Sequence, residues 1–278
     1  MENSGLICNS NNRKWRNLLV LNKLTYGGLI LLLAACLSSV HVFAETDKDL
    51  EKRADLAAKF LVSCRAIIAQ HQDLFNNPDI GDKGFTGEVY ATKVKKHFKD
   101  ATGMVVSEED ASSTDPTKKI LGVLLVSSKT VIEESQKVLN QKGRGFKKVI
   151  PAIVGRRTGY KYNKAMGGGY NLKQTSLKFR NPANHPDAFE KKILEEFEAS
   201  GYPKGKGKGE IVTNIDGSQT YRYMLPLYIK PACLKCHGEP KGERDIAKKI
   251  REGYKEGEIR GAISLKFPYS SDKVAKSE

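Results

Sequence analysis

Two cysteines and a histidine stand within five consecutive residues of this chain, in the run Cys233-Leu234-Lys235-Cys236-His237. Two thiols separated by two residues can add to the two vinyl groups of one porphyrin and form thioether bonds. A histidine directly after the second thiol can give the iron an imidazole nitrogen as its proximal ligand. The run therefore predicts one covalently attached c-type haem, held by Cys233, Cys236 and His237.

Three other uses of a C-x-x-C pair have less support in the sequence. A zinc site needs about four ligands, and a second C-x-x-C or an H-x-x-x-H is missing from the chain. A redox-active pair begins a helix after a strand in a thioredoxin-like pattern, and the sequence has no such pattern. A structural disulfide is the third alternative. Haem is favoured because the N-terminus predicts export.

The first 44 residues have the plan of an export signal. Basic residues begin at Arg13, an apolar stretch covers residues 29–42, and Val42-Phe43-Ala44 resembles an A-x-A cleavage site. We interpret residues 1–44 as a signal peptide and residues 45–278 as a single exported haem domain, periplasmic or otherwise outside the cytoplasm.

Two alternatives keep the protein at a membrane. The run Leu33-Ala34-Ala35-Cys36 resembles a lipobox, in which Cys36 is lipidated and becomes the first mature residue. The signal could also stay uncleaved as an anchor, although Ser38, Ser39 and His41 interrupt the roughly 20 apolar residues that a span needs.

The charge is strongly basic, with 47 Lys and Arg against 32 Asp and Glu and a net charge of +15. Such a charge attracts acidic partners or anionic surfaces, and solubility is the plainer reason for it. Export and haem argue against nucleic acid as a partner. We expect an acidic redox partner or a separate signalling protein, and the sequence holds no signal for the oligomeric state.

The chain after residue 44 divides into a helical half and a strand-rich half. Apolar spacings of three and four predict helices over residues 47–75, 87–99, 116–141, 146–164, 186–200 and 243–252. Candidate strands cover residues 170–179, 210–214, 219–229 and 259–267. The predicted fold class is α+β, a helical N-terminal half followed by an antiparallel sheet with inserted helices.

With His237 as one axial ligand, the second axial position of the iron has several candidates. They are Cys64, His71, His97, Met104, His185 and Met224. Cys64 is the cysteine after residue 44 that the motif leaves unpaired, and it lies on the apolar stripe of the first predicted helix. A buried cysteine can also act as a small hydrophobic side chain, and the position could be open or hold water.

Arginines and aromatic residues supply candidates for the rest of a haem site. Arginine pairs bidentately with carboxylates, so the haem propionates could bind Arg180, Arg222, Arg156 or Arg157. Alternate members of Tyr221, Tyr223 and Met224 are expected to face the haem, with ordinary core packing as the alternative. We choose Arg180 and Tyr223 as the additional cofactor-binding residues.

Four runs carry a resemblance to a known family. They are Gly145-Phe146-Lys147-Lys148-Val149-Ile150-Pro151-Ala152, residues 172–184 with Arg180-Asn181-Pro182-Ala183-Asn184, Asp187-Ala188-Phe189-Glu190, and Cys233 to Gly238. They resemble the exported single-haem c-type proteins with a PAS-like fold. Such proteins occur as free cytochromes in cyanobacteria and as sensor domains ahead of histidine kinases and chemoreceptors. The resemblance covers most of residues 50–268.

The resemblance implies a five-stranded antiparallel PAS-like sheet that cradles the haem. It also implies that a cysteine on the N-terminal helix can be the sixth iron ligand, and Cys64 stands at that position. Sensor members continue into a kinase or receptor segment, and no such segment is expected after residue 268.

The sequence therefore predicts a monohaem c-type cytochrome that acts in electron transfer or in redox or gas sensing, and an enzyme is the less favoured class. The alternative is a haem enzyme with an open iron site, such as a peroxidase or a nitrogen-oxide reductase. A single haem, without a recognisable distal His-Arg pattern, argues against that alternative. A third hypothesis is a ligand-binding module with structural haem.

Overall fold

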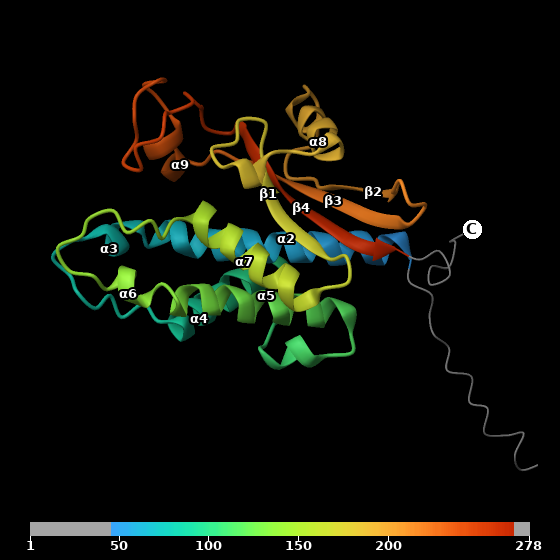
Figure 1. Cartoon of the computed structure of the whole chain (residues 1–278), viewed down its shortest axis with the longest axis horizontal. Coiled ribbons are helices and arrows are strands. Elements are labelled where there is room, and N and C mark those ends of the chain that lie inside the picture. The colour runs from blue at the N-terminus through green and yellow to red at the C-terminus, as the bar shows by residue number, and fades with distance from the viewer. Residues whose placement is uncertain (1–45, 270–278) are drawn as a thin grey trace, which may run out of the picture. The chain divides into compact units, whose positions relative to one another are not determined.

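The computed structural model describes residues 46–269, and the predicted signal segment and lipobox lie outside them. This part of the chain is mixed α and β (Figure 1). Its helices are α2 (Asp47–Gln70), α3 (Gln72–Asn76), α4 (Gly87–Thr102), η1 (Glu109–Ser112), α5 (Pro116–Glu133), α6 (Gln136–Leu139), α7 (Pro151–Met166), η2 (Pro182–Asn184), α8 (Ala188–Glu198) and α9 (Pro231–His237). Its strands are β1 (Asn171–Thr175), β2 (Lys208–Thr213), β3 (Gln219–Tyr228) and β4 (Ile259–Tyr269).

The four strands form one antiparallel sheet in the order β1-β4-β3-β2. β3 and β4 pair from Gln219 opposite Tyr269 to Tyr228 opposite Ile259. The predicted α+β class is confirmed at this level. The fifth strand that the resemblance implies is not confirmed within residues 46–269.

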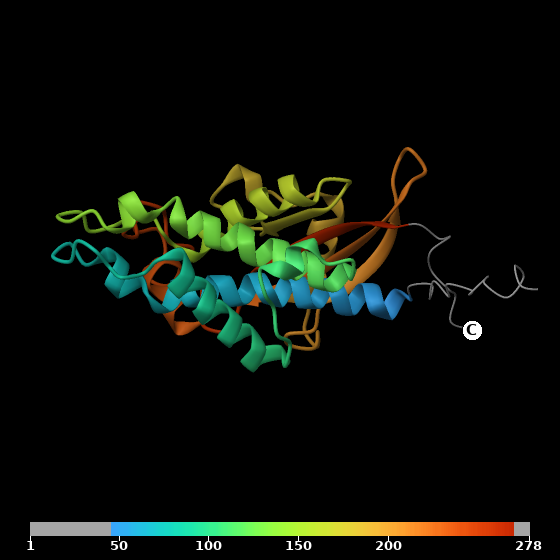
Figure 2. The same cartoon turned by 90° about the horizontal axis from the view of Figure 1, so that it is seen from below.

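Helices cover both faces of the sheet. α2 and α7 pack on one face, α8 packs on the other, and α4 and α5 lie behind α2 and α7. Figure 2 shows this helical layer from below. Side chains of β3 alternate between the two faces. Tyr221 and Tyr223 join the core with the helical layer, whereas Met224 packs with α8.

Small residues let α7 lie close against β1. A Cβ atom at Gly159 would come within 2.6 Å of the Leu172 carbonyl oxygen, and one at Gly155 within 2.9 Å of the Gln174 side chain. Real Cβ atoms do not approach backbone oxygen so closely, so glycine sets the distance between helix and sheet here.

Several predicted boundaries were wrong. The first helix ends at Gln70 with His71 as its cap, and the third ends at Glu133. The helix predicted from residue 146 begins only at Pro151, because proline is favoured at the first helical position.

The predicted helix over residues 243–252 is absent. Asp245 Oδ1 accepts the backbone N–H groups of Ala247 and Lys249, at 2.8 and 2.9 Å. An aspartate that bonds its own following backbone offers the chain a turn instead of a helix.

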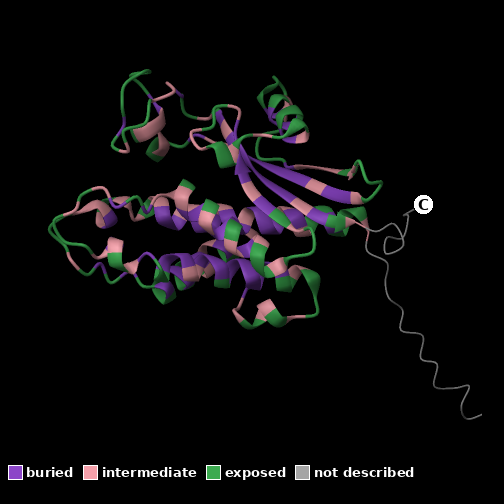
Figure 3. Ribbon diagram, viewed as in Figure 1, coloured by how far each residue is buried: buried purple, intermediate pink, exposed green. Residues whose placement is uncertain are grey.

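Burial follows the layers (Figure 3). The inner faces of α2, α4, α5 and the sheet carry the core, whereas α9 contains no fully buried residue. Among the described residues, no helix is both long enough and apolar enough to cross a membrane.

Candidate functional site

α9 carries both cysteines and the histidine of the C-x-x-C-H run. Pro231 opens the helix, which ends at His237 and is capped by Gly238, where an added Cβ would lie 2.9 Å from the Leu234 carbonyl oxygen. Both thiols are free and half-buried. The Lys230 N–H donates to Cys233 Sγ at 3.4 Å. One short helix therefore presents two free thiols and an imidazole together.

The imidazole of His237 is held in one orientation. Its Nδ1 lies 2.8 Å from Oε2 of Glu252, and a carboxylate can only accept, so Nδ1 carries the proton. Tyr254 donates its N–H to the His237 carbonyl oxygen at 2.8 Å, and its ring meets the imidazole edge-on at 6.4 Å. Among the described residues, nothing hydrogen-bonds Nε2. That nitrogen keeps its lone pair for a metal.

Arg180 forms ion pairs and hydrogen bonds with several groups near His237. Its guanidinium pairs with Glu252 at 2.6 Å and with Asp245 at 2.7 Å. It also donates to the carbonyl oxygens of Cys236, at 2.7 Å, and Ile250, at 2.9 Å. Arg180 therefore fastens the C-terminal end of α9 to the segment that follows it.

The same network sets the charge state of its members. Burial alone would raise the pKa of Glu252, but hydrogen bonds from His237 and Arg180 lower it to about 2. Burial lowers the pKa of His237, assisted by the charges of Arg260 and Arg180. Burial raises the pKa of the Cys236 thiol. At neutral pH the site therefore combines a neutral imidazole with an ionised carboxylate.

Arg65 on α2 lies within electrostatic range of Cys233 and Arg260. Burial lowers its pKa to about 10, the charge of Arg260 acts in the same direction, and that of Cys233 acts against it. Arg65 has no hydrogen bond and no ion pair with any described residue. A half-buried guanidinium without an acceptor is costly, so Arg65 suits an anionic group next to Cys233.

Cys64 points elsewhere. It is fully buried, and its thiol interacts with Tyr90 of α4 and Ser128 of α5. Burial raises the pKa of this thiol to about 11. Successive residues of a helix are turned by about 100°, so Cys64 and Arg65 leave α2 on different faces. Arg65 lies within electrostatic range of Cys233, and ligation of iron by Cys64 stays a prediction.

The other candidate ligands are spread over the fold. His71 caps α2, where its Nδ1 lies 2.7 Å from the Ile67 carbonyl oxygen. His97 lies 3.0 Å from the Ser63 hydroxyl. His185 is exposed and meets the ring of Phe179.

The two methionine candidates also lie apart from one another. Met104 packs at the edge of the helical core, and Met224 is buried under α8.

The remaining predicted haem-binding residues have protein partners. Arg222 pairs with Asp187 at 2.7 Å. The Tyr223 hydroxyl donates to Asp55 of α2 at 2.8 Å, and burial, followed by Asp55, raises its pKa. A direct contact of either residue with haem stays a prediction.

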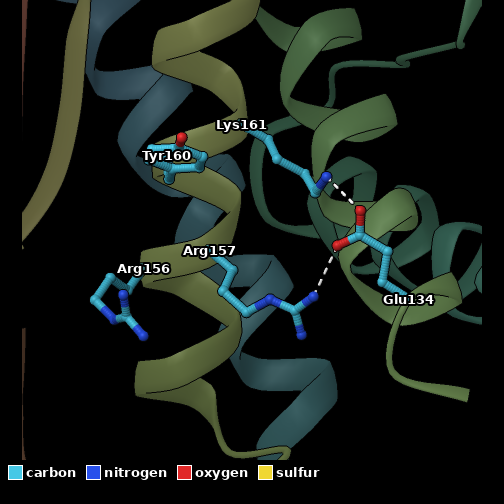
Figure 4. A pocket seen from close by; sticks show the side chains of 5 residues that line it. All are labelled: Glu134, Arg156, Arg157, Tyr160 and Lys161. Atoms are coloured by element: carbon cyan, nitrogen blue, oxygen red, sulfur yellow. Dashed lines mark hydrogen bonds and ion pairs between the residues drawn. The ribbon is translucent and has the colours of Figure 1, made fainter. Parts of the chain in front are cut away.

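Arg156 and Arg157 lie at a separate surface hollow of about 330 Å³ (Figure 4). Arg157 and Lys161 pair with Glu134 at 2.7 and 2.6 Å, whereas Arg156 is exposed and points away from Glu134. No residue of the C-x-x-C-H run lines this hollow.

The residues of α9 fit a covalently bound haem. The helix carries two free thiols and an imidazole whose Nε2 is unengaged, which are the groups that haem thioethers and the iron require. Arg65 of α2, within electrostatic range of Cys233, is a candidate partner for a propionate. Among residues 46–269 no group of three or more His, Cys, Asp or Glu side chains is arranged to hold a metal ion. The zinc alternative thus finds no ligand set in this part of the chain.

The family model for Tll0287-like proteins, described as Tll0287, matches residues 44–268. The chain belongs to the Tll0287-like family. This is a cytochrome c family, and membership indicates a haem c-type cytochrome. No curated protein and no solved structure matches the chain.

Sequence reasoning missed two residues of this site. Glu252 lies in a stretch that was expected to be helical, and nothing in its neighbours singles it out. Arg65 stands directly after Cys64, and only the folded chain shows that it lies within electrostatic range of Cys233.

Proposed function

We propose that this protein is an exported monohaem c-type cytochrome that passes a redox change to a partner protein. The observation that carries the proposal is the arrangement on α9, where two free thiols accompany a histidine whose Nδ1 is anchored and whose Nε2 is free. When bound, haem supplies one-electron redox chemistry and a site for small gases. Electron transfer and redox or gas sensing are the two forms of this function.

The protein residues have separate tasks in the proposal. Cys233 and Cys236 hold the porphyrin covalently, and His237 is the proximal ligand. Arg65 takes a propionate. Since residues 45–278 keep a net charge of +12 of the chain's +15, the expected partner is acidic, and attraction would steer the encounter between the two proteins.

Cys64 as the sixth ligand belongs to the proposal too. The family resemblance supports it, and its present neighbours, Tyr90 and Ser128, would have to give up the thiol. Because only a thiolate binds iron, ligation would also release the proton of a thiol whose pKa is about 11. A thiolate ligand would give a low haem potential.

The first experiment measures haem content and spin state in the holoprotein. The pyridine haemochrome spectrum of denatured wild type should show haem that stays attached, and Cys233→Ala with Cys236→Ala should abolish this attachment. EPR of the oxidised protein then compares wild type with Cys64→Ala, using His71→Asn as the matched control. Loss of a low-spin thiolate signal in Cys64→Ala alone supports Cys64. Haem that is extracted freely from wild type would overturn the proposal.

A haem enzyme with an open iron site is the second candidate. The packing of Cys64 against α4 and α5, on another face of α2 than Arg65, favours it. It predicts a high-spin oxidised protein whose spectrum Cys64→Ala leaves unchanged. Turnover of peroxide or nitrogen oxides by such a protein would support an enzyme in place of the proposed electron-transfer or sensing function.

A further inference from the structure

We propose that Glu252 is the positioning residue of the proximal imidazole, and that its carboxylate strengthens His237 as an electron donor and lowers the haem midpoint potential. The inference rests on the proposed function, because it requires His237 to be the iron ligand. It concerns a residue about which the C-x-x-C-H pattern says nothing.

The contact between the two side chains is short and sheltered. Oε2 of Glu252 lies 2.8 Å from Nδ1 of His237, and the two side chains are 14% and 21% exposed. A histidine that binds metal donates its other ring N–H to an acceptor, and the acceptor fixes the ring and raises the basicity of the ligand. An ionised acceptor makes a stronger bond than a neutral carbonyl does.

The carboxylate of Glu252 has little freedom to move. Arg180 donates to both of its oxygens, from Nε to Oε1 at 2.6 Å and from Nη2 to Oε2 at 2.7 Å. Arg260 on β4 lies 3.6 Å from Oε1. Two arginines thus compensate a partly buried negative charge, which keeps Glu252 an acceptor and keeps the imidazole in one orientation.

The anchor of Glu252 is itself secured. Arg180 precedes η2, and its guanidinium also holds Asp245, whose side chain is fully buried, and the carbonyl oxygen of Cys236. The bonds therefore join the end of α9, the 245–252 segment and the chain before η2. This connection gives Nδ1 of the imidazole a fixed acceptor. A fixed acceptor keeps the electron-donor strength of Nε2 constant.

The test compares holoproteins that lose one negative charge at two positions. Glu252→Gln removes the carboxylate at His237, and Glu256→Gln removes an exposed carboxylate of the same segment that has no hydrogen bond or ion pair with a described residue. Glu252→Asp keeps a carboxylate on a shorter chain. Spectroelectrochemical titration gives the midpoint potential, and the pyridine haemochrome gives the haem content.

We expect Glu252→Gln to raise the midpoint potential, Glu256→Gln to change it far less, and Glu252→Asp to restore part of the wild-type value. Equal shifts in Glu252→Gln and Glu256→Gln would overturn the inference, since a general charge effect would then explain both. Wild type without covalent haem would instead overturn the proposed function.

A measurement on wild type covers the case in which the Glu252 variants do not fold. In the proton NMR spectrum of the haem-loaded protein, the Nδ1–H of the ligand histidine should exchange slowly with D₂O, because a buried carboxylate holds it. Rapid exchange of this proton would contradict the inference even without a folded variant.

Discussion

At the scale of single residues, some members of the candidate site are evident from their spacing in the sequence, and others are evident only in the folded structure. The grouping of Cys233, Cys236 and His237 on one short helix was predictable from their spacing, and their part in thioether attachment and ligation stays a prediction. The places of Glu252 and Arg65 were not predictable, because Arg65 comes from α2 and Glu252 from the irregular segment after α9. No local pattern encodes the rotation of α2 or the path of residues 239–258.

Arg65 gives a prediction at this scale. Replacing it in Arg65→Gln removes a positive charge that faces Cys233, which favours the oxidised haem and lowers the midpoint potential. The equivalent free energy is about 0.5–2 kcal/mol for a charge at this range in a partly shielded site. Potentiometric titration measures it, with Arg156→Gln as the control at an exposed arginine. A potential that moves equally in both variants would place Arg65 outside the haem environment.

At the scale of elements, apolar periodicity predicted which segments are helices better than where they end. The expected pieces from residue 47 to residue 164 are helical in large part, since their apolar stripes are long. The Asp245 turn replaced a helix because its carboxylate bonds backbone N–H groups two and four residues ahead. A hydrophobic pattern does not reveal that a side chain will compete with the helix for backbone N–H groups.

The contact between α7 and β1 gives a prediction at this scale. In Gly159→Ala the new methyl group meets the Leu172 carbonyl oxygen, so helix and strand must separate. We expect the free energy of unfolding to fall by about 1–3 kcal/mol, as in other overpacked cores. Urea denaturation followed by circular dichroism measures it. Gly145→Ala, at an open loop position, should leave stability unchanged or up to about 1 kcal/mol higher.

At the scale of the whole molecule, the α+β class was predictable, and each of the four candidate strands coincides in large part with a strand of residues 46–269. The strand-rich half was predicted from residue patterns that are typical of strands. A fifth strand rested on resemblance alone. β3 and β4 pair along nearly their full lengths. This pairing depends on contacts between residues that are far apart in the sequence.

Stability in acid should depend on Asp245. Burial alone would raise the pKa of this carboxyl, but bonds from the Lys249 N–H and from Arg180 hold it below the usual 3.8. The unfolded chain therefore binds a proton at higher pH than the folded one, and the stabilisation, complete above 3.8, is lost as pH falls through the lower value.

Asp245→Asn should lower stability at neutral pH and flatten its decline below pH 3.8. Chemical denaturation at a series of pH values measures both effects. The control Asp73→Asn changes a carboxylate that is 95% exposed, and it should keep the wild-type slope. An unchanged slope in Asp245→Asn would contradict the expectation.

The segment 229–258 leaves the sheet after β3 and returns to it at β4, and its base is closed by backbone bonds. Ile229 donates its N–H to Glu258 at 2.8 Å, and Gly257 donates to Ile229 at 2.9 Å. Closing a loop costs only about 0.6 kcal/mol more for each doubling of its length. Pairing of β3 with β4 thus depends little on the conformation of the segment that connects them. If the proposed haem is attached to α9, we therefore expect its attachment to be possible after the sheet has already formed.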